Sequence, residues 1–418
     1  MKITSQPQPA YQYFQLENGI RIIHRFNPAA VSHLALMVNT GSRDELQSES
    51  GIAHLIEHMI FKGTKKRRAF HVISRLENVG CDLNAYTTKE ETCLHATFLN
   101  PYYERALDLF ADIAFNSVYP LRELEKEKDV ILDEINSYRD NPSEEIFDEF
   151  ENLLYRGHPI GHNILGSVET VKNFNRNHIF RFIKNNYSTD QMVIASVGNI
   201  QFEKLKKYVI KYYSDVPVAQ KKSPRLPFTA YKPEYEVHDR TNYLSHCLIG
   251  NIAYPFYHPR KHALILLNNI LGGPGLNSRL NLNIREKYGF TYSIDSQYTS
   301  YSDTGWFGVY LGTDPGTVNK TIDLVKRELK KLTQSNMGVL QLARAKQQLI
   351  VQLAIGFESG LQEALSIARS HLLKEDVESM AAIIHRIEAI DAKELLEVSN
   401  EIFDQSQLST LIFEGKNT

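Results

Sequence analysis

The sequence predicts an α+β protein made of two similar domains. Strand-like and helix-like segments occur in blocks along the chain, which favours α+β over the strict alternation of a doubly wound fold. The order of these segments in the first half reappears in the second half. A chain of 418 residues is also too long for one ordinary domain. We therefore expect two homologous α+β domains, each with a mainly antiparallel sheet and a helical layer.

The connection between the two domains is expected at residues 217–233. This stretch holds four prolines and several basic residues and has no helical period, which is typical of an exposed linker. The first domain is therefore predicted at residues 1–216 and the second at residues 234–418.

Apolar periodicity and turn residues predict the elements within each half. In the first half, strands are expected at 11–15, 19–25, 32–39, 81–86, 92–99 and 192–197, and helices at 51–62, 69–79, 102–116, 121–140, 144–155, 168–185 and 202–213. In the second half, strands are expected at 234–237, 243–253, 292–299, 306–311 and 408–413, and helices at 258–271, 276–287, 318–332, 340–356, 360–373 and 377–387.

Composition excludes several classes of protein. Hydrophobic residues make up 42% and charged residues 23%, as in a globular protein with a real core. The net charge of −2 offers no electrostatic basis for binding nucleic acid or an anionic membrane. The three cysteines form no CxxC pair, so a thiolate zinc site is not expected. Because we find no signal peptide and no transmembrane stretch, we expect a cytoplasmic protein.

The strongest local motif is His54-Leu55-Ile56-Glu57-His58, within the apolar segment GIAHLIEHMIF. A helix that is apolar on every side is expected to be buried, and its polar groups then need partners. Residues four apart share a helix face, so His54 and His58 can point at one metal ion, and Glu57 can reach the same place. Catalytic zinc takes three protein ligands and an open position, so a third ligand must come from elsewhere.

The helix predicted at 121–140 offers two candidates for that ligand. On a helical projection, its apolar positions fall close to one line: Leu124, Ile131, Ile135 and Tyr138. Glu127 and Glu134 lie inside the wide apolar arc around that line. For a single glutamate, an exposed helix position would be the simpler interpretation. Two acids seven residues apart on the buried side favour a shared polar site instead.

An HxxEH motif followed by a distant glutamate resembles the inverted-motif zinc peptidases, specifically the M16 family of pitrilysin, insulysin and the mitochondrial processing peptidases. Further segments resemble that family in the right order, namely EHMIFKGTKKR, NAYTTKEET, EKEKDVILDEI, HNILGS and LNIREKYGFTYSI. The resemblance implies that His54, His58 and Glu134 bind Zn²⁺ and that Glu57 is the general base.

The resemblance also implies roles for residues outside the motif. Glu127 matches an acid that supports the site without binding the metal. Arg285 and Tyr292 match a pair from the second half that contacts substrate or the developing oxyanion. Asn84 and Ala85 match a strand that binds the peptide backbone, as an edge strand can do through main-chain hydrogen bonds.

The function implied by the resemblance is a zinc-dependent endopeptidase that hydrolyses peptides or unfolded segments inside a closed chamber. Zinc lowers the pKa of a bound water and polarises the scissile carbonyl, while Glu57 takes the proton from that water. A chain of this length resembles half of the family's clamshell-like chamber. This implies a homodimer, or a heterodimer with a related subunit, in which Arg285 and Tyr292 could act on the partner's zinc.

A second class of function remains open at this point. Related chains also serve as non-catalytic subunits that bind peptides or assemble with a processing peptidase-like partner. The intact set His54, Glu57, His58 and Glu134 favours the enzyme. In the second half, His258 and His262 are also four apart but lack the glutamate, so no zinc site is expected there.

Overall fold

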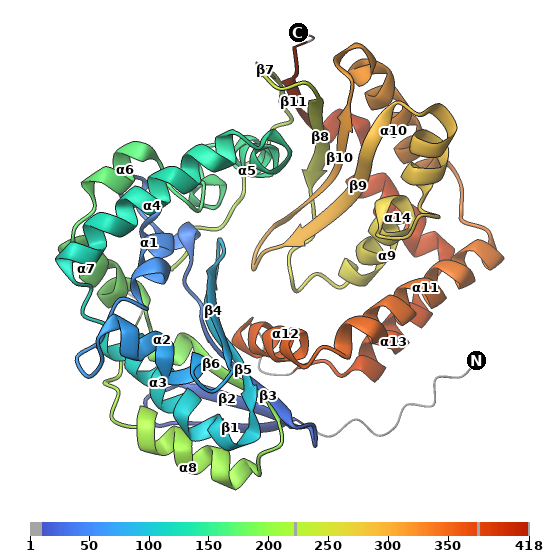
Figure 1. Ribbon diagram of the computed structural model, residues 1–418. Coiled ribbons are helices and arrows are strands. Elements are labelled where there is room, and N and C mark those ends of the chain that lie inside the picture. The colour runs from blue at the N-terminus through green and yellow to red at the C-terminus, as the bar shows by residue number, and fades with distance from the viewer. Residues whose placement is uncertain (1–10, 221–223, 374–376, 417–418) are drawn as a thin grey trace. The chain divides into compact units, whose positions relative to one another are not determined.

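The computed structural model describes residues 11–220, 224–373 and 377–416. Its chain forms two compact units (Figure 1). The first unit comprises residues up to Ile135, His162–Arg225 and Ile355–Ser379. The second comprises Asn136–Gly161, Leu226–Ala354 and residues from Met380 onward. Each compact unit therefore combines segments from both halves of the sequence. The domain boundaries predicted at residues 216 and 234 stay a prediction.

The first unit is built on a six-stranded sheet in the order β1-β2-β6-β3-β5-β4. Its strands are β1 (Gln12–Gln15), β2 (Arg21–Phe26), β3 (Val31–Val38), β4 (Asp82–Thr87), β5 (Thr92–Leu99) and β6 (Met192–Gly198). Neighbouring strands are antiparallel except for β2 and β6, which are parallel. Every residue of β6 is buried, as expected for an apolar strand in the middle of a sheet.

The helices around this sheet place the polar motif beside its edge. They are α1 (Ile52–Met59), α2 (Ala69–Glu77), α3 (Tyr103–Asn116), α4 (Leu121–Arg139), α6 (Val168–Asn173), α7 (Arg176–Asn186) and α8 (Phe202–Tyr213). Both α1 and α2 contact β4, while α3 packs on β5, α2 and α8. The apolar motif helix therefore lies next to the edge strand β4.

The second unit is built on a five-stranded sheet in the order β7-β11-β8-β10-β9. Its strands are β7 (Tyr235–Asp239), β8 (Ser245–Ile252), β9 (Thr291–Ser300), β10 (Gly305–Thr313) and β11 (Ser409–Glu414). Its helices are α5 (Pro142–Leu154), α9 (Lys261–Gly272), α10 (Val318–Gln334), α11 (Val339–Phe357), α13 (Met380–Ala389) and α14 (Ala392–Ile402). A single large apolar cluster joins α9, α10 and α14 to the sheet.

The two sheets share one topology. Apart from the additional strand β1, one strand in each sheet pairs in parallel with the last strand of that sheet, β2 with β6 and β7 with β11, and the remaining pairs are antiparallel. The order β2-β6-β3-β5-β4 in the first unit corresponds strand for strand to β7-β11-β8-β10-β9 in the second. The prediction of two related α+β domains with mainly antiparallel sheets is therefore confirmed.

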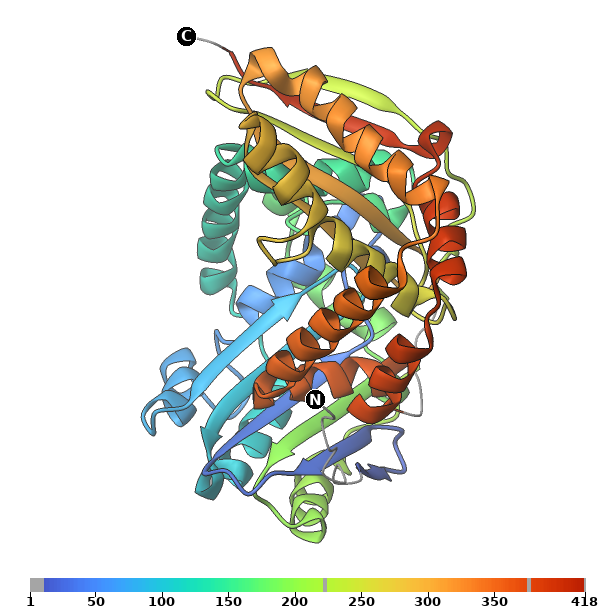
Figure 2. The same cartoon turned by 90° about the vertical axis from the view of Figure 1, so that its right-hand side faces the viewer.

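Each sheet is covered on one face by a helix from the other half of the sequence. The α12 helix (Gly360–Leu373) packs on β3 and β6 of the first sheet, and α5 packs on β8 and β11 of the second. In Figure 2, the orange-red α12 lies across the strands of the first sheet. Buried residues of α12, including Ala364, Ile367 and Ala368, complete an apolar cluster with that sheet. The two halves of the sequence thus exchange helices.

Polar contacts hold both exchanged helices in place. Arg21 on β2 donates to the carbonyl oxygens of His371 and Leu372, at 2.6 and 3.2 Å, at the C-terminal end of α12. On α5, the buried Glu151 accepts a hydrogen bond from Trp306 Nε1 at 2.6 Å and another from the hydroxyl of Tyr301. A buried acid that is paired in this way avoids the cost of an unsatisfied charge.

Some predicted elements differ from the structure. The helix expected at 168–185 is two helices, because the side chain of Asn175 accepts from the backbone N–H of Asn177 and starts a new helix there. The helix expected at 276–287 is centred on a π-helical segment, Asn281–Glu286. The prediction missed α14 entirely. No helix within the described ranges is long and apolar enough to cross a membrane.

The exchange of α12 predicts that a charge on its buried face destabilises the fold. Ala368 is fully buried against the first sheet. We expect Ala368→Asp to lower the free energy of unfolding by about 3 kcal/mol or more, because an unpaired carboxylate would be buried. Urea unfolding followed by circular dichroism measures the change. The control is Ser366→Asp on the exposed side of the same helix, for which a change within about 0.5 kcal/mol is expected. Equal stability of the two variants would contradict the packing of α12 described above.

Candidate metal centre

The motif helix α1 begins at a tight, well-defined cap. Gly51 has a φ of +95°, and a Cβ on this residue would lie 2.6 Å from the carbonyl oxygen of Leu165, so glycine is required there. The buried carboxylate of Glu45 accepts hydrogen bonds from the backbone N–H groups of Gly51 at 2.9 Å and Ala53 at 2.8 Å. These bonds satisfy donors that a helix start leaves unpaired and favour a negative charge at that end.

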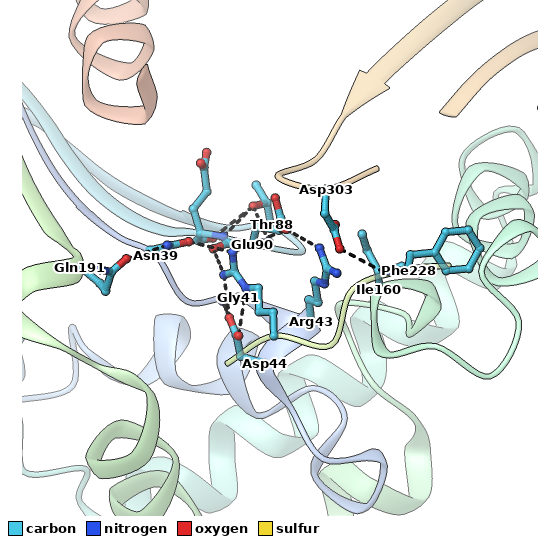
Figure 3. A network of polar contacts seen from close by, with 12 residues as sticks. Asn39, Gly41, Arg43, Asp44, Thr88, Glu90, Ile160, Gln191, Phe228 and Asp303 are labelled. Atoms are coloured by element: carbon cyan, nitrogen blue, oxygen red, sulfur yellow. Dashed lines mark hydrogen bonds and ion pairs between the residues drawn. The ribbon is translucent and has the colours of Figure 1, made fainter. Parts of the chain in front are cut away.

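A network of ion pairs anchors the loop that carries this cap, as Figure 3 shows. Arg43 pairs with Glu90 at 2.6 Å, and both side chains are nearly inaccessible. Arg225 donates to Asp44 at 2.8 Å and to Asn39 at 2.8 Å. Because Asp44 directly precedes Glu45, these pairs hold the chain immediately before the residue that caps α1.

The two histidines of α1 lie on one face of the helix. His54 and His58 are four residues apart, and their ring centroids are 4.6 Å apart. Burial lowers the pKa of His54 to about 3, and the charge of His58 adds to this effect. His54 is therefore held as a neutral imidazole at physiological pH, which is the form that binds a metal.

The third group comes from α4, as the sequence pattern indicated. Glu134 Oε2 lies 3.8 Å from His54 Nε2 and 3.7 Å from His58 Nε2. One ligand atom from each of these three residues falls within 4.8 Å of the others. We call these three candidate ligands, His54, His58 and Glu134, the metal centre. Leu124, Ile131 and Ile135 bury the apolar side of α4, which explains how the helix holds Glu134 toward α1.

Glu127 contacts the metal centre through one of its ligands, His58. Its Oε2 accepts a hydrogen bond from His58 Nδ1 at 3.1 Å, and its Oε1 lies 2.6 Å from Lys62 Nζ. A carboxylate can only accept, so His58 must carry its proton on Nδ1. The lone pair of Nε2 then points to the side where Glu134 lies. In contrast, Nδ1 of His54 is buried without a hydrogen-bond partner among the described residues.

Glu57 is placed next to the metal centre on the same helix. Burial raises the pKa of its carboxyl, although contact with Thr87 and the charge of His58 oppose this rise. Burial raises the pKa of Tyr187 to about 12, the charge of Glu57 adds to this rise, and a hydrogen bond with Thr92 opposes it. A carboxylate that is close to the metal centre and is not one of its three clustered groups is suited to exchanging protons.

The three groups fit a divalent metal ion such as zinc. Two imidazole nitrogens and one carboxylate oxygen are a common ligand set for catalytic zinc, which keeps one position open. Zinc bonds of about 2.0–2.2 Å place tetrahedral ligand atoms roughly 3.4 Å apart, close to the separations of 3.7 and 3.8 Å observed here. The side chains therefore need only small movements to bind one ion.

A pocket of about 340 Å³ opens beside the metal centre. Its walls combine apolar and charged side chains, namely Glu57, His58, Phe61, Lys62, Ile73, Glu77, Leu83 and Glu127. Asn84 and Ala85 lie nearby in sequence on β4, which pairs with β5 and forms the edge of the first sheet. The pocket and an edge strand are thus both part of the unit that holds the metal centre.

Arg285 and Tyr292 belong to the second unit. Arg285 lies in the π-helical segment and Tyr292 near the start of β9, and both side chains are exposed. Arg285 donates to Asn281 Oδ1 at 3.5 Å. Their participation in a site with the metal centre stays a prediction.

Sequence reasoning missed three residues that support the metal centre. Lys62 follows His58 by four residues, so the spacing used for the two histidines could have indicated it. Thr87 ends the strand that carries Asn84, but nothing in its local pattern marks it as a neighbour of Glu57. Glu45 lies in an irregular loop, and no sequence signal identifies it as the cap of α1.

Comparison with known proteins now places the chain in a family. The family model described as insulinase (peptidase family M16) matches residues 21–168, and the model described as the peptidase M16 inactive domain matches residues 173–349. An uncharacterized zinc protease of Bacillus subtilis is 30% identical over 97% of this chain and 98% of its own. The chain therefore belongs to the M16 peptidase family, as a two-domain member.

Other relatives include enzymes named as processing peptidases. The mitochondrial-processing peptidase subunit beta of Bos taurus is 31% identical over 94% of this chain and 82% of its own. Among solved structures, a protease from Helicobacter pylori has a TM-score of 0.91 at 22% identity, covering 97% of this chain and 100% of that one. A peptidase M16 inactive domain from Pseudomonas fluorescens also has a TM-score of 0.91, at 19% identity and 98% coverage of both chains. These two structures support the fold.

The geometry predicts one bound zinc ion per chain that depends on α1. We expect His54→Ala to lower zinc affinity by at least about 10-fold, because one of three protein ligands is lost. Metal analysis after equilibration with a chelator measures the loss. The matched control is His262→Ala on α9, the helix that corresponds to α1 in the second unit, and its zinc content should equal that of the unmodified chain. Similar losses in both variants would argue against the metal centre.

Proposed function

We propose that the protein is a zinc-dependent endopeptidase that hydrolyses peptides or unfolded segments. One observation carries this proposal, namely that His54, His58 and Glu134 present ligand atoms within 4.8 Å of one another. Glu57 on the same helix provides a carboxylate beside them. Relatives over nearly the whole chain are named as zinc proteases and as processing peptidases, which supports the same assignment.

Each residue has a chemical task in this proposal. A zinc ion held by His54, His58 and Glu134 would act as a Lewis acid toward the scissile carbonyl and the attacking water. Glu57 accepts the proton of that water and delivers it to the leaving amine. Glu127 orients the imidazole of His58 through Nδ1. Arg285 and Tyr292 supply positive charge and a hydroxyl donor for the oxyanion.

The substrate is proposed to bind as an added strand. The edge strand β4 carries Asn84 and Ala85 and has a partner strand, β5, on one side. An extended peptide can pair with such an edge through its backbone, which selects an unfolded shape more than a particular sequence. The adjacent pocket, with Phe61, Ile73 and Leu83 in its wall, would accept a side chain next to the cleaved bond.

Replacing the proposed base should separate metal binding from turnover. We expect Glu57→Gln to keep its zinc and to lose about 10²- to 10⁴-fold in kcat, the usual contribution of a positioned acid or base. Cleavage of an unstructured fluorogenic peptide, with metal analysis of the same sample, measures both quantities. Asp133→Asn, an exposed neighbour of Glu134 on α4, serves as the control and should keep full activity. If Glu57→Gln keeps full turnover, Glu57 is not the base, and if the unmodified chain cleaves nothing, a non-catalytic subunit is favoured.

The enzyme is further proposed to work as a cytoplasmic dimer that encloses its substrate in a chamber. The partner is a second copy of this chain or a related subunit. In this arrangement Arg285 and Tyr292 of one chain act at the zinc of the other. Support comes from their position in the second unit, whereas all three groups of the metal centre belong to the first.

Shared sites in a homodimer predict that two inactive variants restore each other. Glu57→Gln lacks the base and Arg285→Ala lacks the oxyanion contact, so a mixed dimer would contain one complete site. After random exchange of subunits in an equimolar mixture, about a quarter of the wild-type activity is expected. Peptide cleavage by the mixture is compared with cleavage by each variant alone. An additive result would mean that each chain uses its own Arg285, or that the chain does not form this dimer.

A further inference from the structure

The proposed function assigns no task to Lys62, a charged residue in the wall of the pocket beside the metal centre. Lys62 lies three residues after the end of α1, and its Nζ lies 2.6 Å from Oε1 of Glu127 on α4. The lysine side chain is 26% exposed and that of Glu127 only 10%, so this is not an ordinary surface pair. The pair joins the segment after α1 to α4, and these two helices supply all three groups of the metal centre.

The two oxygens of Glu127 have different partners. Oε1 pairs with Lys62, and Oε2 accepts from His58 Nδ1 at 3.1 Å. An ammonium group is a compact charge and can occupy one oxygen while leaving the other to a second donor. With Oε1 held by Lys62, the carboxylate cannot turn away from the imidazole without losing a charge-assisted hydrogen bond.

The charge of Lys62 also matters for the balance of the site. Glu57, Glu127 and Glu134 place three carboxylates around one metal position. A divalent ion compensates two of these charges, and Lys62 is positioned beside Glu127 to compensate the third. Without the lysine, the mostly buried carboxylate of Glu127 would be left uncompensated, which is costly. It could then turn from His58 or compete with Glu134 for the metal.

We propose that Lys62 is a positioning residue of the metal centre, which acts through Glu127 to hold the imidazole of His58 in its metal-binding tautomer and orientation. This inference rests on the proposed zinc centre and adds to it the residue that orients one of its ligands. His54 has no comparable support at Nδ1 among the described residues. Among the described contacts of the two histidines, the hydrogen bond from His58 Nδ1 to Glu127 is therefore the one that orients a ligand imidazole through the ring nitrogen that does not face the metal.

Zinc affinity of the full-length chain tests the inference directly. We expect Lys62→Met to weaken zinc binding about 10- to 100-fold, the usual effect of losing a group that orients a ligand. Competition with a chromogenic chelator measures this affinity without any need for catalytic activity. Lys62→Arg keeps a cation beside Glu127 and should recover most of the affinity. Lys66→Met removes an exposed lysine from the same loop and should bind zinc as the unmodified chain does.

A double-substitution cycle shows whether Lys62 acts through Glu127. The combined variant Lys62→Met/Glu127→Gln should bind zinc about as well as Glu127→Gln alone, because the proposed role of the lysine requires the carboxylate of Glu127. The visible absorption of the Co²⁺-loaded chain should change in Lys62→Met and be restored in Lys62→Arg. Thermal unfolding of the chelator-treated variants establishes that each one is folded.

The outcomes separate this inference from the function on which it rests. Unchanged zinc affinity in Lys62→Met would overturn the positioning role, even if KM for peptides rose because Lys62 contacts substrate in the pocket. Independent losses in the double variant would overturn the route through Glu127. If the unmodified chain binds zinc and Glu57→Gln abolishes turnover, the proposed function stands in either case. If the unmodified chain binds no zinc, both fail together.

Discussion

The structure of the first unit depends on satisfying the polar groups of a buried helix. The α1 helix is apolar around most of its surface, yet it carries two imidazoles and a carboxylate. Such groups are stable inside a protein only when they have partners or a bound cation. The α4 helix provides Glu127 and Glu134, and Glu45 satisfies the backbone at the start of α1. The same contacts therefore stabilise the buried helix and position the groups proposed to take part in catalysis.

The internal repeat differs between its two copies at the candidate ligands, because the group of His54, His58 and Glu134 lies in the first unit and no second group of this kind is found among the described residues. In each sheet, the helix after the second strand of the shared pattern is strongly apolar, namely α1 in the first unit and α9 in the second. The sequence of α9 contains no acidic residue, and neither does that of α11, which follows β10 and α10 as α4 follows β5 and α3. The buried side of α11 carries Leu342, Leu349 and Ile350 instead. These residues belong to the same apolar cluster as Leu264 and Leu267 of α9.

The exchanged helices link the two halves of the repeat, because each helix completes the core of the sheet from the other half. Residues of β2, β3, β5 and β6 on one face of the first sheet would be exposed without α12, and α5 covers the second sheet in the same way. Each sheet consequently needs a segment from the other half of the sequence. The two halves have similar topology but complete each other's cores.

Much of this protein follows from local sequence patterns. Apolar periodicity identifies most helices and strands within one to three residues, because burial of one face recurs at a fixed interval in each kind of element. The HxxEH spacing and the buried arc with Glu127 and Glu134 indicate the groups that the structure brings together. Side-chain spacing within one helix is fixed by its geometry, so these features need no knowledge of the rest of the fold.

Only the tertiary structure decides which elements pack together. The sequence of α12 shows that it has a buried face, but nothing in its pattern indicates that this face packs on the first sheet, because apolar contacts are non-directional. Glu45 and Lys62 gain their roles from neighbours that lie far away in sequence or on another helix. The sequence alone determined the two-domain α+β class and the candidate ligands, since both depend on local geometry. Helix exchange and the supports of the metal centre depend on long-range packing, which local patterns do not encode.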